Sequence, residues 1–170
     1  MFHPFFSKQK AVALAACCAL LALPALAVVT VTKTTDLSFG KLVPGTTSGT
    51  VNISTSGLRT PSSSVTLFTQ ASTQQAAVFA VSGGPTNTTC ALTVPSATSS
   101  LSGTGAVMPL SGFSASNAGN SVIPLDGSLG SITLDGSGAY TVKVGATLTV
   151  GASEPAGVYT GDFSVTVTCP

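Results

Sequence analysis

Two pairs of residues in this 170-residue sequence are of types that could do chemistry. Ser38 and Lys41 stand at the S-x-x-K spacing, at which a lysine can activate a serine nucleophile in β-lactamase-like enzymes. Cys90 and Cys169 could form a disulfide, remain buried free thiols or supply a nucleophilic thiolate. The elements that carry each pair decide which of these chemistries is possible.

The serine–lysine pair lacks the surroundings that its chemistry needs. In those enzymes the motif lies on a helix that begins at the serine, whereas here it leads into the turn sequence Gly-Lys-Leu-Val-Pro-Gly, and S-D-N and K-T-G motifs are absent. Beyond residue 27 the chain has no histidine, so no imidazole can carry the proton for serine or cysteine catalysis. Zinc-ligand clusters and phosphate-binding glycine loops are also absent. The sequence predicts a protein that is not an enzyme and needs no cofactor or metal.

A Leu-Asp-Gly-Ser sequence occurs twice, at Leu125–Ser128 and Leu134–Ser137. Calcium-binding repeat arrays stack many more copies than two. Asp-Gly between apolar alternations is typical of a β-hairpin. We therefore expect two hairpin turns rather than a calcium site.

The N-terminus has the build of a secretory signal peptide. Lys8 and Lys10 precede an apolar run that is broken by Pro24 and ends in the small residues Ala25 and Ala27, which predicts cleavage after Ala27. Two alternatives are a lipoprotein box that ends at residue 17 and an uncleaved anchor, since apolar residues continue to residue 29. Cleavage predicts export by the Sec route to the periplasm, and then to the cell surface or outside, with no stable membrane span.

Without residues 1–27, four basic and five acidic side chains remain, a formal net charge of −1. Such a chain has no basic patch to attract nucleic acid or an anionic membrane. We expect neither as a partner.

The two remaining cysteines predict a disulfide. An even pair behind a signal peptide is typical of an oxidising compartment. Cys90 alternates in phase with Leu92 and Val94, and Cys169 with Val165 and Val167, so both sulfurs should point into one core. The alternative is two buried free thiols.

Short strand-like runs alternate with turn signals throughout residues 28–170, and no run has the stripe of an amphipathic helix. The aromatic residues are spread one to a strand, which favours core positions over a sugar-stacking platform. This pattern predicts one all-β domain, an Ig-like antiparallel β-sandwich. The expected strands are 28–33, 36–39, 49–55, 64–69, 77–81, 90–94, 106–113, 131–134, 139–144, 147–150 and 157–169.

Two long runs resemble a known family. "LSFGKLVPGTTSGTVNISTSGLRT" at Leu37–Thr60 and "GATLTVGASEPAGVYTGDFSVTV" at Gly145–Val167 resemble the opening and ending of the bacterial domain of unknown function 4402. The ending is also similar to that of chaperone–usher fimbrial subunits and spore-coat-U-type pilins. The resemblance implies an Ig-like, pilin-like sandwich in a surface or fimbrial assembly, with no activity attached.

The start of the predicted domain, Val28 to Lys33, is rich in β-branched residues, and Val29 and Val31 fall on one face. A free strand of this kind is an aggregation hazard unless it is paired. It could be donated to the open sheet edge of a neighbouring subunit, with Val28, Val29 and Val31 as donor residues. It could equally be the first strand of its own domain.

These observations predict a non-enzymatic structural subunit that joins like subunits by strand addition, with a periplasmic chaperone as a further partner. The alternative is a self-contained adhesion or glycan-binding sandwich that uses loops such as Ala115–Ser121.

Overall fold

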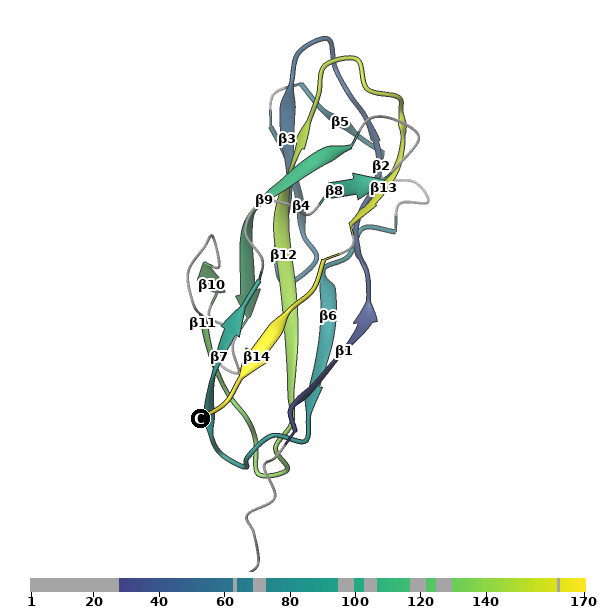
Figure 1. Ribbon diagram of the computed structural model, residues 1–170. Coiled ribbons are helices and arrows are strands. Elements are labelled where there is room, and N and C mark those ends of the chain that lie inside the picture. Colours follow the sequence, from purple (N-terminus) through teal and green to yellow (C-terminus); the bar gives the residue numbers. More distant parts are fainter. Residues whose placement is uncertain are drawn as a thin grey trace, which may run out of the picture.

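The structure, a computed structural model, describes residues 28–62, 64–68, 73–94, 100–102, 107–116, 122–124, 130–161 and 163–170. Every regular element in these ranges is a β-strand, as the sequence predicts. The strands pack as an elongated sandwich of antiparallel sheets (Figure 1). Residues 1–27, with the predicted cleavage residues Ala25 and Ala27, lie outside the described ranges.

One layer is built around a single long strand, β12, which runs along most of the molecule (Figure 1). Its first half pairs with β6 and its second half with β3, while β9 pairs along its other side. β1 extends this layer beyond β6, β4 extends it beyond β3, and β10 pairs with β9. The bounds are β1 (Thr30–Thr35), β3 (Gly49–Ile53), β4 (Arg59–Pro61), β6 (Ala77–Ser82), β9 (Met108–Ser116), β10 (Val122–Pro124) and β12 (Tyr140–Val150).

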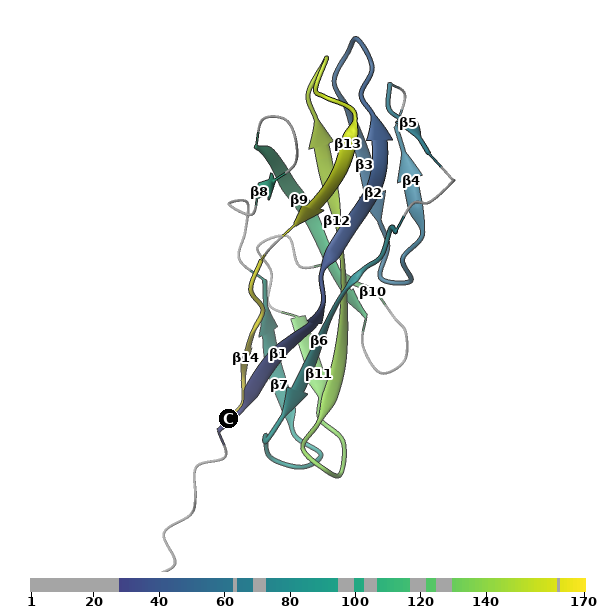
Figure 2. The ribbon, with the colours of Figure 1, turned by 90° about the vertical axis from the view of Figure 1, so that its right-hand side faces the viewer.

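Two smaller groups of strands cover the other side of the core. At one end β9 leads through β8 to β13, β2 and β5, and at the other end β11, β7 and β14 form a separate sheet. Figure 2 shows β13 and β14 following one another along this side. The bounds are β2 (Leu37–Val43), β5 (Thr66–Leu67), β7 (Thr89–Thr93), β8 (Ser100–Ser102), β11 (Gly130–Thr133), β13 (Gly157–Gly161) and β14 (Thr166–Thr168).

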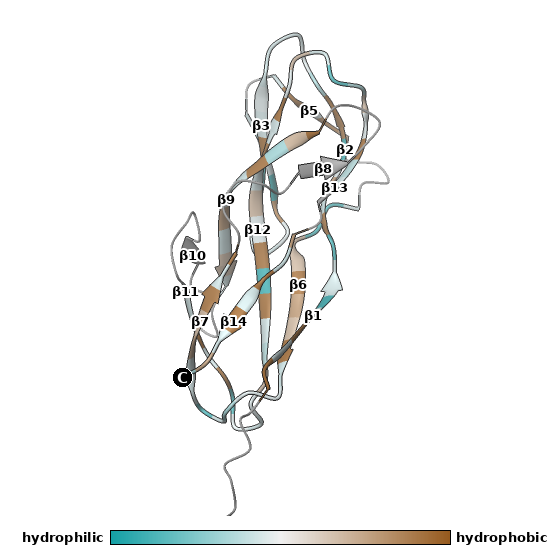
Figure 3. Ribbon diagram, in the orientation of Figure 1, coloured by the Kyte–Doolittle hydropathy of each residue, from teal (hydrophilic) through white to brown (hydrophobic). Residues whose placement is uncertain are grey.

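The core follows the expected alternation along each strand. In β6, for example, Ala77, Phe79 and Val81 are buried while the residues between them are half-buried. The ring of Phe163 lies 5.5 Å from that of Phe79 and 5.2 Å from that of Phe113, centroid to centroid, so it joins the two layers. Figure 3 shows hydrophobic and hydrophilic residues interleaved along the long strands, as two-faced strands require.

Two predicted divisions between strands are wrong, and β2 and β9 end at Val43 and Ser116, beyond the expected ends at residues 39 and 113. Residues 139–144 and 147–150 form one strand, β12, because Gly145 at the expected break allows the backbone of Ile53 and Thr55 to come close as β12 changes its partner from β6 to β3. Residues 157–169 form two strands, because the chain passes from the β13 sheet to the β14 sheet between them. The short strands β4, β8 and β10 were not expected from the sequence.

Candidate functional site

The most prominent candidate for interaction is the side of the sandwich where β14 and β1 form the layer edges. β14 pairs only with β7, and β1 pairs only with β6, so the outer edge of each has no partner strand among the described residues. Figure 2 shows both strands on the side that faces the viewer. Unpaired edges expose main-chain N–H and C=O groups that can accept another strand.

The side chains next to these edges are apolar and incompletely covered. Val167 lies opposite the buried Leu92, and Val31 lies opposite the buried Val81, so both point inward. Both are nevertheless only half-buried and pack against the rim of the core, as Val29 does. A further strand on this side would cover them.

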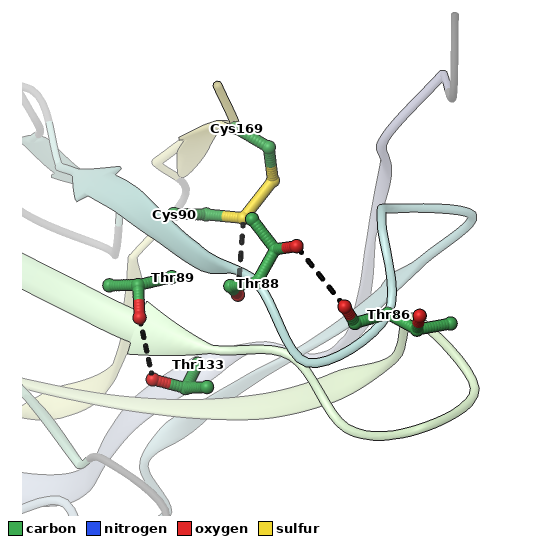
Figure 4. Close-up of a disulfide and its surroundings, with 6 residues drawn as sticks. All are labelled: Thr86, Thr88, Thr89, Cys90, Thr133 and Cys169. Atoms are coloured by element: carbon green, nitrogen blue, oxygen red, sulfur yellow. Dashed lines mark hydrogen bonds between the residues drawn. A yellow bond between two sulfur atoms is a disulfide. The ribbon is translucent and has the colours of Figure 1, made fainter. Parts of the chain in front are cut away.

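The disulfide that the sequence predicts holds the end of β14. Cys169 lies opposite Cys90, directly after Thr168 pairs with Ala91, and the two sulfurs are bonded with a Cα–Cα distance of 4.3 Å. Figure 4 shows the bond at the start of β7, beside the pair of Thr89 and Thr133 hydroxyls, which lie 3.1 Å apart. The disulfide rules out the free-thiol and nucleophile alternatives in this structure. It fixes the free edge of β14 against β7.

Tyr159 shapes the entry into the last two strands. Its side chain is fully buried and its hydroxyl donates a 2.6 Å hydrogen bond to the carbonyl of Pro155. A buried tyrosine that bonds back to the preceding turn fixes the corner at the start of a late strand in Ig-like sandwiches. This contact accounts for the tyrosine at position 159 and holds the turn before β13 against the start of that strand.

The predicted donor segment pairs within its own chain. β1 lies antiparallel to β6 with Val31 opposite Val81, which is the second of the two alternatives raised by the sequence. Its side-chain attachment is shallow: only Val31 and Thr35 are half-buried, and Val28, before the strand, is 78% exposed. Donation of the same segment to a neighbouring subunit stays a prediction.

Ser38 and Lys41 each make other contacts. Ser38 is buried in β2 and its hydroxyl accepts a hydrogen bond from the Gly40 amide, whereas Lys41 is exposed and its ammonium lies 5.1 Å from the ring centre of Phe68. Across a register shift in β2, Ser38 lies opposite Thr160 and Lys41 lies opposite Val158, so both side chains are on the outer face of the strand. No hydrogen bond joins the two side chains in the described structure. Phe68 is 41% exposed, so the expectation that every aromatic residue is a core residue is wrong at this position.

The second Leu-Asp-Gly-Ser sequence is a tight turn. One carboxylate oxygen of Asp135 accepts hydrogen bonds from the Ser137 amide, the Ser137 hydroxyl and the Ala139 amide. The predicted hairpin is wrong, because the turn joins β11 to β12 across two sheets instead of two paired strands. The first copy lies outside the described residues, within which no cluster of three potential metal ligands occurs.

Sequence reasoning missed the role of Arg59. Its guanidinium donates to the carbonyls of Phe39 at 2.7 Å, Lys41 at 3.1 Å and Phe68 at 2.6 Å. One side chain on β4 therefore ties β2 to the residue after β5. Every residue has a carbonyl, so no side-chain pattern in the sequence indicated these acceptors.

A comparison with protein families finds a match. The model of the domain of unknown function DUF4402 matches residues 29–168, a range that includes every strand described above. The chain belongs to the DUF4402 family. No curated protein and no solved structure matches it. In this DUF4402 protein the described residues include no helix that is long and apolar enough to cross a membrane.

Proposed function

We propose that this DUF4402 protein is a non-enzymatic structural subunit of an extracytoplasmic surface assembly, and that it joins like subunits by β-strand addition. The observation that carries the proposal is the unpaired edge of β14, fixed by the disulfide and bordered by the half-buried Val167. The similarity of the last two strands' sequence to the ending of fimbrial and spore-coat-U-type subunits supports the same function. In this proposal the protein reaches the surface through the Sec route and the periplasm, where a chaperone covers the edge before assembly.

The donor is the segment from Val28 through Lys33. It is β-branched, and β1 pairs only with β6 and buries little of its side chains, so its release breaks one strand pairing. At the neighbour the segment would pair with the free edge of β14, and main-chain hydrogen bonds formed there would replace those that it loses at β6. Val29 and Val31 would then cover apolar side chains of the neighbour, and main-chain hydrogen bonds would supply most of the affinity.

Denaturing electrophoresis of the exported protein, with and without boiling, tests this function. We expect a ladder of oligomers in unboiled samples, because complementing strands that complete a sandwich dissociate slowly. Boiling should collapse the ladder to a monomer. Removal of residues 28–33 should also abolish it.

Two matched variants of β1 separate strand addition from general aggregation. Val29→Asp with Val31→Asp places charges on the inward face, whereas Thr30→Asp with Thr32→Asp places the same charges on the exposed face. The inward pair should abolish the ladder and the outward pair should keep it, since burying an unpaired carboxylate is costly. A ladder that both pairs leave intact would contradict the proposal.

A second candidate function is a self-contained secreted binding module. The pairing of β1 with β6 of its own chain favours it, because the layer is then complete without a neighbour. A single monomeric band in every unboiled sample, with unchanged thermal stability after loss of residues 28–33, would support this alternative and overturn the first. The Ala115–Ser121 loop suggested by the sequence extends beyond the described residues after Ser116.

A further inference from the structure

An open pocket of about 300 Å³ lies on the outer face of the β1–β6–β12 layer, away from the β14 edge. It forms where β12 changes its partner from β6 to β3, between the β3–β4 turn and the segment that leads into β6. A volume at the lower end of the range for ligand sites suits one small ring or a molecule of similar size. The residues that matter here are Thr55, Gln74, Gln75, Ala76, Val78 and Lys143.

The pocket is preformed by main-chain contacts. In the β3–β4 turn the Gly57 amide donates to the Ser54 carbonyl, and the Ser54 amide donates to the Leu58 carbonyl. Gly57 has a φ of 81°, a conformation that favours glycine, and it lines the pocket. On the opposite wall Gln75 forms an antiparallel bridge with Ser38. Both walls are therefore held without a ligand.

Thr55 is a nearly buried polar residue of the pocket lining. The residue is only 8% exposed, and its hydroxyl makes no hydrogen bond within the described part of the chain. Burying a hydroxyl without a partner costs free energy, so such groups usually have a partner. Of the neighbouring amides, Gln75 uses its Nε2 to donate to the Asp36 carbonyl, which leaves its side-chain oxygen to accept from a ligand.

Among the described residues, the pocket lining carries positive charge only. Lys143 on β12 lies at the wall, is exposed and has no ion-pair partner among the residues that the structure describes. The described lining includes no aspartate or glutamate. Ala76 and Val78 give the lining a small apolar surface between these polar groups. The set of groups is one cation, a hydroxyl, amides and a short apolar wall.

We propose that this pocket binds a small polyhydroxylated carboxylate, of which an acidic sugar is the natural class. The Lys143 ammonium would pair with the carboxylate, the Thr55 hydroxyl and the Gln75 oxygen would bond to sugar hydroxyls, and Val78 would contact the ring. Thr35, the last residue of β1, also lines the pocket, but it lies outside the donor segment 28–33. The described lining includes no residue of β14, so the site can be tested apart from the strand addition proposed above. A free monosaccharide and the end residue of an acidic polysaccharide share this chemistry.

Titration of the ¹⁵N-labelled protein with galacturonate and with galactose, followed by NMR, tests the proposal. We expect backbone resonances at residues 55–57, 74–76 and 143 to shift, with a dissociation constant on the order of 1 mM for galacturonate. Galactose should bind about fivefold more weakly, the upper range for an exposed ion pair. Acetate alone should bind more weakly than either, because it lacks the hydroxyls. A galacturonate oligomer distinguishes a free monosaccharide from the end of a polysaccharide as the ligand. If the oligomer binds with the same affinity per chain end, the pocket recognises the end residue. If the oligomer does not bind, the pocket takes the free sugar.

Three variants assign the contacts. Lys143→Gln should remove the preference for galacturonate over galactose, whereas the matched variant Lys41→Gln, on β2 outside the pocket, should keep it. Thr55→Val should weaken both sugars by about threefold to tenfold, as expected for one hydrogen bond. Thr55→Val should also leave the unfolding temperature unchanged or raised, because it removes a buried hydroxyl without a partner. This second readout separates the loss of one hydrogen bond from a misfolded pocket.

Several results would overturn the inference. Equal binding of galacturonate and galactose, shifts confined to residues outside the pocket, or no saturable shift at tens of millimolar sugar would each exclude an acidic-sugar site here. None of these results bears on the oligomer ladder, which depends on β1.

Discussion

Cys169 lies directly opposite Cys90 across the last strand pair, and their bond closes a sequence separation of 79 residues. Because β14 is short and pairs on one side only, this bond is its strongest attachment to the domain. The bond therefore both stabilises the fold and presents the free edge on which the proposed assembly depends.

Cys169→Ser should lower the unfolding temperature only under oxidising conditions. Closing a loop of this length is worth about 4–5 kcal/mol in the chain-entropy model, and measured values are often smaller. Thermal unfolding in the presence and absence of reductant measures the effect, with Cys90→Ser/Cys169→Ser as the control for a stray thiol. An equal loss with and without reductant would show that the side chain, and not the bond, is what matters.

Tyr159→Phe should lower the free energy of unfolding by about 1 kcal/mol. The variant keeps the buried ring and removes only the hydroxyl that bonds to Pro155. Tyr140→Phe is the matched control, because the Tyr140 hydroxyl makes a longer, 3.3 Å bond to the Ser116 carbonyl and the residue is half-buried. Urea unfolding should show the larger loss for Tyr159→Phe, and the reverse order would contradict the role given to this corner.

The all-β fold and the disulfide could be predicted because both depend on local periodicity. Phe163 and Val165 are buried and Val167 and Cys169 are half-buried, while the residues between them are exposed, as strict alternation requires. The same alternation continues across the change of sheet after Gly161, so it could not show that β13 and β14 have different partners. Pairing depends on which strands lie alongside, and the alternation within one segment does not indicate its neighbours.

The candidate sites could also be predicted from the sequence only in part. The apolar face of the N-terminal strand could be predicted from Val29 and Val31, but its pairing with β6 could not, because both alternatives bury the same residues. The pocket at Thr55 and Lys143 was not predicted at all. It depends on Gly145, which interrupts a predicted strand pattern and yet continues β12 in the structure.

Arg59→Lys should lower the free energy of unfolding by about 1–3 kcal/mol. An ammonium cannot reproduce the planar guanidinium that reaches the carbonyls of Phe39 and Phe68 at once. Lys143→Gln, an exposed change at a side chain without a hydrogen bond or ion pair in the described structure, should change stability by less than about 0.5 kcal/mol. Chemical denaturation compares the two variants. Similar small effects in both would mean that water replaces the guanidinium at these carbonyls.

Asp135→Asn should flatten the dependence of stability on pH in acid. The Ser137 hydroxyl, followed by the amides of Ala139 and Ser137, holds the pKa of Asp135 below its usual range by bonding to the carboxylate. A group whose pKa is lower in the folded state stabilises the fold above its unfolded pKa, and this contribution is lost as the pH falls below about 4. Asparagine keeps an acceptor oxygen for the turn but cannot take up the proton. Unfolding temperatures from pH 7 to pH 2 should therefore differ between the wild type and the variant by an amount that is constant near neutrality and shrinks in acid. Parallel curves over the whole range would show that the turn does not depend on the charge.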